Sequence, residues 1–248
     1  MNLRKAITAA AAVSAAALLV LTPSAQASSP TGSDITQIPI NGNGTAGTVA
    51  VSGTLKAGNL TFDALAFTTS CAGGTVAGNV NRGPFTSGGT AFSLSTLSLS
   101  CPTPLGINAN MTVSPGCLIY VTMGNVKQTP FNDNVHPGLI DSGKWAGTTP
   151  KPKLHNALGR ASIGSKCVAV TLPGSSCTAR ADGNVAVEFN EAIKTVSGVN
   201  YQELILKGPG LTLRNQTAAC LGLMSGSVTL NQITFNLPTT TTGNIDFR

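Results

Sequence analysis

The residue types best suited to chemistry gather in one segment, residues 127–159. It holds both histidines and the single tryptophan of the chain. Alternating apolar residues are scarce there, and a long irregular loop in a compact domain often carries function. We therefore predict a candidate binding loop. The alternative is a structured excursion whose tryptophan packs on the sheet. The candidate binding residues are Asp133, His136, Asp141, Trp145 and His155.

Two kinds of metal site fit these residue types. Asp133 and Asp141, with the asparagines beside Asp133, offer the oxygen ligands that calcium prefers. The segment lacks the spaced acidic pattern that ends in a bidentate glutamate. His136 and His155, together with Asp133, are ligand types for a transition metal, but two distant histidines are common as ordinary packing residues. We expect no resident metal and no cofactor.

A hydrolase is the enzymatic alternative for the same loop. His136, an aspartate of the loop and Ser142 are the residue types of a hydrolytic triad, but no Gly-x-Ser-x-Gly turn presents the serine. Glu188, Glu191 and Glu203 are carboxylates of the type that a glycosidase pairs across a cleft. Aromatic residues that frame sugars are scarce, at 4% of the chain. We assign no catalytic residue.

The N-terminus has the three parts of a secretory signal peptide. Arg4 and Lys5 precede an apolar, alanine-rich stretch, and the sequence Ala25-Gln26-Ala27 supplies small residues for cleavage before Ser28. We predict a signal peptide over residues 1–27, a loose segment over 28–34, and one β-rich domain over 35–248. The remaining chain has no apolar run long enough to span a membrane.

Six cysteines in an exported chain predict three disulfides, and no Cys-x2-Cys pair suggests a metal site. Six cysteines allow 15 connectivities. A Pro-Gly turn lies between the fourth and fifth cysteines, and the first two bracket a glycine-rich, strand-like block. These local signals favour the pairs Cys167–Cys177 and Cys71–Cys101, which leaves Cys117–Cys220.

The charge of the chain is low and dispersed. Asp, Glu, Lys and Arg make up 10% of the residues, and Ser, Thr, Asn and Gly take surface positions instead. The formal net charge is +6, of which Arg4 and Lys5 leave with the signal peptide. A nucleic-acid-binding protein more often has clustered basic residues with aromatic residues among them. We therefore expect no nucleic-acid partner.

Short period-two apolar runs recur between turn signals, which is typical of antiparallel sheets. We predict an all-β protein, an antiparallel β-sandwich or partly open barrel with little helix. A strand over 184–195 should pair with one over 201–207. The apolar parity flips within residues 92–99 and again within 228–235, which predicts either a β-bulge or a strand that crosses between sheets in each. Residues 154–161 are suited to a short helix.

These features favour a secreted or cell-surface, non-enzymatic protein that binds an unknown extracellular or cell-envelope partner. This interpretation rests on the absence of catalytic patterning and on analogy with extracellular β-sheet modules. A secreted hydrolase that uses the 127–159 loop is one alternative. An extracellular carrier of a small apolar ligand is another.

Overall fold

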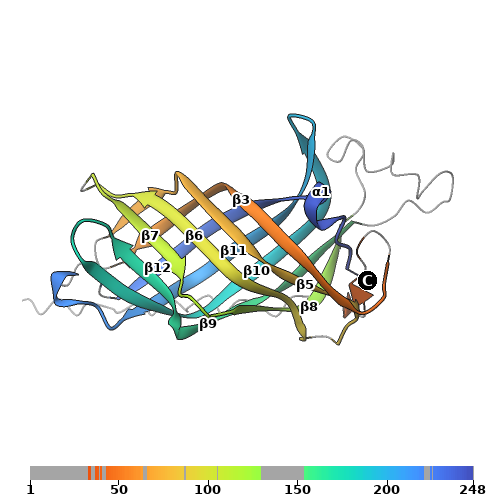
Figure 1. The fold of residues 1–248 in the computed structure, drawn as a ribbon, viewed down its shortest axis with the longest axis horizontal. Helices are drawn as coiled ribbons and strands as arrows, with labels where there is room; N and C mark the ends of the chain where they lie inside the picture. Colours follow the sequence, from red (N-terminus) through yellow and green to blue (C-terminus); the bar gives the residue numbers. More distant parts are fainter. Residues whose placement is uncertain are drawn as a thin grey trace, which may run out of the picture.

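The chain forms one large antiparallel sheet whose strands follow each other around a ring (Figure 1). The computed structural model describes residues 33–34, 37–38, 40, 43–63, 66–86, 88–104, 106–129, 154–220, 224 and 226–247. The strands are β1 (Ser33–Asp34), β2 (Gln37–Ile38), β3 (Gly47–Phe62), β4 (Phe67–Ser70), β5 (Gly73–Pro84), β6 (Thr90–Pro102), β7 (Asn108–Val113), β8 (Ile119–Thr129), β9 (Leu154–Leu172), β10 (Cys177–Val196), β11 (Val199–Arg214) and β12 (Ser227–Pro238). A 3-10 turn, η2 (Ala218–Cys220), and one short helix, α1 (Thr239–Thr242), complete the described elements.

The ring is closed by hydrogen bonding between β5 and β6. From β9 the order runs through β10, β11, β12, β3 and β5, and β5 pairs with β6 from Gly73↔Ser100 to Val80↔Phe92. β7 and β8 share the next position, because β6 pairs with both and both pair with β9. The all-β antiparallel class is therefore confirmed, and the architecture is a closed barrel of strands rather than a sandwich.

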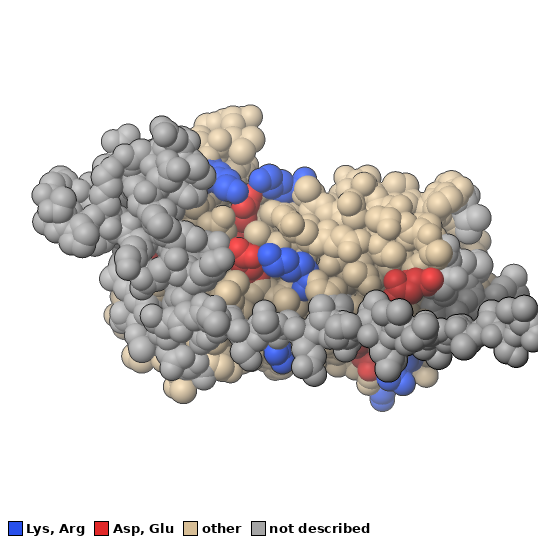
Figure 2. Space-filling view, turned by 180° about the vertical axis from the view of Figure 1, so that it is seen from behind, with Lys and Arg blue, Asp and Glu red and all other residues tan. Residues whose placement is uncertain are grey.

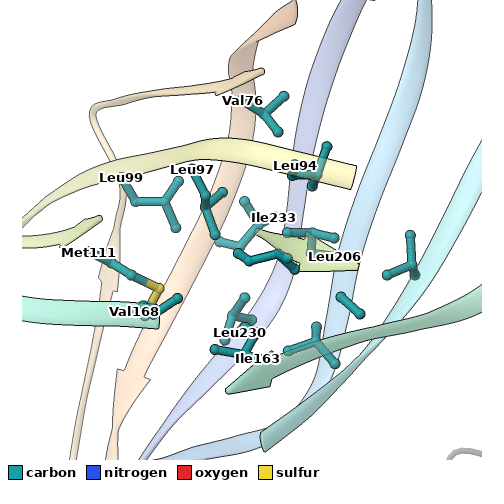
Figure 3. Packing of buried hydrophobic residues seen from close by; sticks show 14 of the residues in the cluster. Val76, Leu94, Leu97, Leu99, Met111, Ile163, Val168, Leu206, Leu230 and Ile233 are labelled. Atoms are coloured by element: carbon teal, nitrogen blue, oxygen red, sulfur yellow. The ribbon is translucent and has the colours of Figure 1, made fainter. Parts of the chain in front are cut away.

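The interior of the ring is filled by alternate side chains from every strand of the closed path. In Figure 3, Leu97, Ile233 and Leu206 of β6, β12 and β11 gather near the centre of the view, and Val76 of β5 lies above them in the same buried cluster. Each of these side chains is buried. Period-two alternation places one face of each strand inside, so the short apolar runs of the sequence become one continuous core.

Both predicted parity flips are β-bulges. In β6 the register shifts where Ala77 and Gly78 face Thr96 and Leu94, which leaves Ser95 as the extra residue. In β12 the register with β3 shifts between Asn231 and Thr234. Each bulge restores the later apolar residues to the inner face. The bulge reading is confirmed, and the strand-crossing alternative is wrong for both.

Each bulge faces a glycine on the neighbouring strand. A Cβ atom at Gly78 would lie 2.1 Å from the carbonyl oxygen of Ser93, and one at Gly58 would lie 2.7 Å from the Cα atom of Ile233. Such contacts are not available to any side chain. The bulged strands therefore approach their partners closely only because glycine stands opposite.

The two ends of the ring are built differently. At one end lie the β9–β10 turn and the β6–β7 connection, where Cys177 and Cys101 are found. We call it the disulfide end. At the other end, β2 pairs with the end of β5, and Ile40 forms an isolated bridge with Ile245 of the segment 243–247. We call this the tail end. Figure 1 marks the C-terminus there.

Three disulfides are present, and they leave no cysteine free. The predicted pair Cys71–Cys101 is confirmed, while the other two predicted pairs are wrong. The β9–β10 register sets Cys177 opposite Leu172, five residues along the strand from Cys167. At about 3.3 Å per residue that offset is too great for a bond. The observed pairs are Cys117–Cys167 and Cys177–Cys220.

Three local predictions need correction. Residues 154–161 are not a helix but the start of β9, paired with β8 and β10. The two ends of the predicted 127–159 loop, residues 127–129 and 154–159, therefore belong to strands β8 and β9. Ser33 and Asp34, predicted to be loose, pair with Val126 and Asn125 of β8. The expected strands over 184–195 and 201–207 are confirmed within β10 and β11. The predicted signal peptide lies outside the described residues.

Within the described part of the chain, no helix has the length and apolar character that a membrane span requires.

The disulfide pairing can be checked by digesting the unreduced protein and identifying the linked peptides by mass spectrometry. We expect peptides that join Cys117 to Cys167 and Cys177 to Cys220, and no thiol that reacts before reduction. A peptide that joins Cys117 to Cys220 would contradict the register of β9 with β10.

Candidate functional site

Most of the predicted binding loop lies outside the described residues. This applies to Asp133, His136, Asp141 and Trp145. His155 is on β9, where its backbone pairs with Gln128 of β8. Among the residues that the structure describes, no group of three or more His, Cys, Asp or Glu residues is placed to hold a metal ion. The role of the loop stays a prediction.

Four adjacent strands, β3, β5, β6 and β7, carry a set of uncharged outward side chains, which we call the hydroxyl face. Lys56 of β3, which pairs with Glu203, lies beside this set and is not part of it. Every member is a Ser, Thr, Asn or Ala residue that is exposed or half-buried. Its residues are Thr48, Ala50, Ser52, Thr54, Thr75, Ala77, Asn79, Asn81, Ser93, Ser95, Thr96, Ser98, Ser100, Asn108, Asn110 and Thr112.

Strand register arranges the hydroxyl face in rows. Thr54 faces Thr75, Thr75 faces Ser98, and Ser98 faces Thr112, so four hydroxyl side chains cross four strands in one line. Adjacent strands lie about 4.8 Å apart, which sets the spacing along the row. Each hydroxyl can donate one hydrogen bond and accept two. The row is therefore a regular line of donors and acceptors.

An exposed aromatic residue borders this face. Tyr120 on β8 is in register with Ser93 of β6 and with Ser162 of β9, and 49% of its surface is exposed. Leu118, two residues earlier, is 41% exposed. Tyrosine combines an apolar ring with a polar hydroxyl and is enriched at binding surfaces. The border thus adds an apolar contact to the hydroxyl rows.

The wall formed by β10 and β11 has the opposite character, because ion pairs cross it. Glu188 on β10 pairs with Lys207 on β11 at 2.6 Å, and Asp182 pairs with Arg214 at 3.1 Å. Figure 2, seen from behind Figure 1, shows acidic and basic residues gathered near the middle of that face. Charge is therefore divided unevenly around the ring.

Glu203 is the centre of the largest of these ion-pair groups. Its carboxylate binds Lys56 of β3 and Lys194 of β10, each at 2.6 Å, and only 4% of its side chain is exposed. Burial alone would raise the pKa of Glu203, but hydrogen bonds from Lys194 and Lys56 outweigh it and hold the pKa below its ordinary value. The group ties β3 to β10 across β11 and β12.

The three glutamates considered for glycoside hydrolysis do not share one face. Glu188 and Glu203 pair with lysines of the outer wall. Glu191 instead accepts a hydrogen bond from the buried backbone of Phe247 at the tail end. Two carboxylates facing each other across a cleft, as a glycosidase requires, are not formed by these three.

A second polar arrangement lies at the tail end, within the ring. Gln202 on β11 is buried, and its side-chain amide binds both backbone groups of Ile245. Phe247 is fully buried, and its ring lies beside those of Phe92 and Phe189. The segment 243–247 is thus held inside the ring mouth by side chains rather than by a strand ladder.

Sequence reasoning missed both arrangements for different reasons. Alternating Ser, Thr and Asn residues were visible in several strands, but only the strand order shows that four of these strands are neighbours. Phe247 alternates with only one other apolar residue, Ile245, and a run that short does not mark a strand or a core residue. An isolated buried glutamine such as Gln202 leaves no pattern either.

Comparisons with known proteins add little to this geometry. No protein-family description matches the sequence, and no curated protein matches it. Among solved structures, the chain is similar to DynF from the dynemicin biosynthesis pathway of Micromonospora chersina, with a TM-score of 0.41 and 15% identity over 87% of each chain. At that level of similarity, no functional conclusion follows.

Replacement of Glu203 by Gln should lower the free energy of unfolding at neutral pH by on the order of 1 kcal/mol. Because the pKa of Glu203 is lowered in the folded protein, its contribution is present above the ordinary value of 4.5 and is lost as the pH falls through the folded value. Urea unfolding of both proteins across the acid range measures this. If the free energy of unfolding of Glu203→Gln is lower than that of the unchanged protein by the same amount at strongly acidic pH, the ion-pair account is contradicted. Glu188→Gln, which removes a more exposed carboxylate, should have a smaller effect.

Replacement of Phe247 by Ala should destabilise the protein by about 3–5 kcal/mol, because a fully buried aromatic ring is removed. Val196→Ala is the control, since Val196 is 52% exposed, and it should change stability by no more than about 0.5 kcal/mol. Equilibrium unfolding with the disulfides intact compares the two. Equal stability of the two variants would show that the ring of Phe247 is not inside.

Proposed function

We propose that this protein is an exported, non-enzymatic binding protein and that the hydroxyl face is the surface that meets its partner. The three disulfides are consistent with an oxidising, extracellular environment. The uncharged face of β3, β5, β6 and β7 is the observation that carries the proposal. The partner is an extracellular or cell-envelope molecule.

The chemistry of the face favours a neutral, hydroxyl-rich partner such as an uncharged polysaccharide. A charge that is buried without a partner costs far more than a hydroxyl or amide that exchanges water for another hydrogen bond. Short Ser, Thr and Asn side chains also lose little conformational entropy on binding. Tyr120, at the border of the face, supplies an aromatic surface on which a sugar ring can rest.

The interior of the ring supports this choice of surface. The inward residues form one apolar cluster that includes Phe92, Phe189 and Phe235, each fully buried. An occupied interior leaves the outer wall as the larger surface for recognition. The hydrolase and carrier alternatives stay predictions, and the residues 130–153 of the hydrolase loop lie outside the described part of the chain.

The test is sedimentation of the purified, oxidised protein with cellulose and chitin as uncharged polymers, with an anionic polysaccharide as comparison. We expect the protein to sediment with an uncharged polymer, and the bound fraction to be the same at low and high salt. Thr75→Arg, which places a charge at the centre of the hydroxyl row, should weaken binding by about tenfold or more.

Thr212→Arg is the matched control, because Thr212 is also exposed but lies on β11. It should bind as the unchanged protein does. Equal loss of binding in the two variants, or binding only to the anionic polymer in a salt-dependent manner, would contradict the proposal. So would the absence of sedimentation with either uncharged polymer.

A further inference from the structure

We propose that the tail end of the ring is a peptide-recognition site, which the chain occupies with its own segment 243–247. The ligand class is an extended peptide with an aliphatic residue followed two residues later by an aromatic one. Ile245 and Phe247 provide this pattern in the chain itself. The proposal does not depend on the hydroxyl face, because it concerns the interior at one end of the ring.

The first recognition element is the side-chain amide of Gln202. Its Oε1 accepts a hydrogen bond from the backbone N–H of Ile245 at 2.8 Å, and its Nε2 donates to the backbone carbonyl of the same residue at 2.7 Å. This paired donor and acceptor reproduces what an adjacent strand offers to an extended peptide. One buried side chain therefore recognises a backbone, whatever its sequence.

The second element is the carboxylate of Glu191, which accepts a hydrogen bond from the backbone N–H of Phe247 at 2.5 Å. Gln202 is itself held in place by Glu191, because its Nε2 also donates to the backbone carbonyl of that residue at 3.0 Å. The two side chains thus contact alternate residues of the segment, as a partner that binds an extended backbone must.

The third element is an aromatic pocket that provides specificity. The ring of Phe247 lies 5.3 Å from that of Phe189 and 6.3 Å from that of Phe92, measured between ring centroids. Both neighbours are themselves fully buried. These separations are in the range favoured for aromatic pairs. A peptide with a smaller side chain at this position would leave the pocket partly empty.

Segment 243–247 lies outside the strands of the sheet, and Ile245 forms an isolated bridge with Ile40, which is likewise outside the named strands. The segment follows α1 through Gly243, whose φ of 79° turns the chain and whose N–H binds Thr239. The groups that contact the segment are side chains of β6, β10 and β11. A peptide of the same pattern from another chain would therefore contact the same side chains.

The experiment uses full-length Phe247→Ala and a fluorescent peptide with the sequence of residues 243–248. The variant vacates the aromatic pocket, so we expect it to bind the peptide at least about tenfold more tightly than the unchanged protein, whose own segment competes. Fluorescence anisotropy measures binding. A peptide with Ala in place of the Phe should not bind.

The role of Gln202 is tested in the same background. Phe247→Ala combined with Gln202→Leu should bind the peptide about tenfold more weakly than Phe247→Ala alone. The matched control combines Phe247→Ala with Gln216→Leu, since Gln216 is exposed near the disulfide end, and it should bind normally. Equal effects of the two leucine substitutions would overturn the recognition by Gln202.

A folded Phe247→Ala protein, with its three disulfides and β-sheet circular dichroism intact, that does not bind the peptide overturns the proposal. If Phe247→Ala does not fold, Phe247→Leu takes its place, because it keeps most of the apolar volume. It should bind the peptide more tightly than the unchanged protein does. If neither variant folds, the segment is an inseparable part of the core, and the proposal is likewise overturned.

Discussion

The hydrogen bonds between β5 and β6 are the interaction on which the rest of the structure depends. They join the two ends of the sheet, so neither strand is left as an open edge on that side. Closure also decides which residues are inside, because every strand of the path must turn the same face to a shared axis. The bulges at Ser95 and after Asn231 follow from this requirement, since each corrects the parity of a strand that would otherwise turn its later apolar residues outward.

Closure has a second consequence, which is that the outer surface becomes one continuous wall with two distinct parts. Ion pairs such as Glu203 with its two lysines fasten strands on one part, and short uncharged side chains cover the other. The glutamates Glu188 and Glu203 of the outer wall are thus each paired with lysines. The hydroxyl face itself has no charged member that would have to be desolvated when a partner binds.

The fold class was accessible from the sequence because it depends on local patterns. Period-two runs gave the strands, and parity flips near Leu94 and Leu230 gave the bulges. Ring closure and the disulfide pairs depend on which distant strands are neighbours, which no local pattern encodes. Cys167 illustrates this, since the nearby Cys177 was the obvious partner in sequence, while Cys117 is its partner in space. The candidate sites also depend on distant neighbours. The hydroxyl face can be recognised only once the strand order is known, and the burial of Phe247 only once the position of segment 243–247 is known.

Amide hydrogen exchange at the β5–β6 junction tests the closed ring most directly. Slowly exchanging amides are those whose hydrogen bonds break only when the structure opens globally. The account predicts that the paired amides between Gly74 and Val80, and those of Phe92 to Leu99, exchange as slowly as the paired amides of β10 and β11. Rapid exchange along β5 and β6, at the rate of an unpaired edge, would show an open sheet and would contradict both the filled interior and the neighbouring strands that form the hydroxyl face.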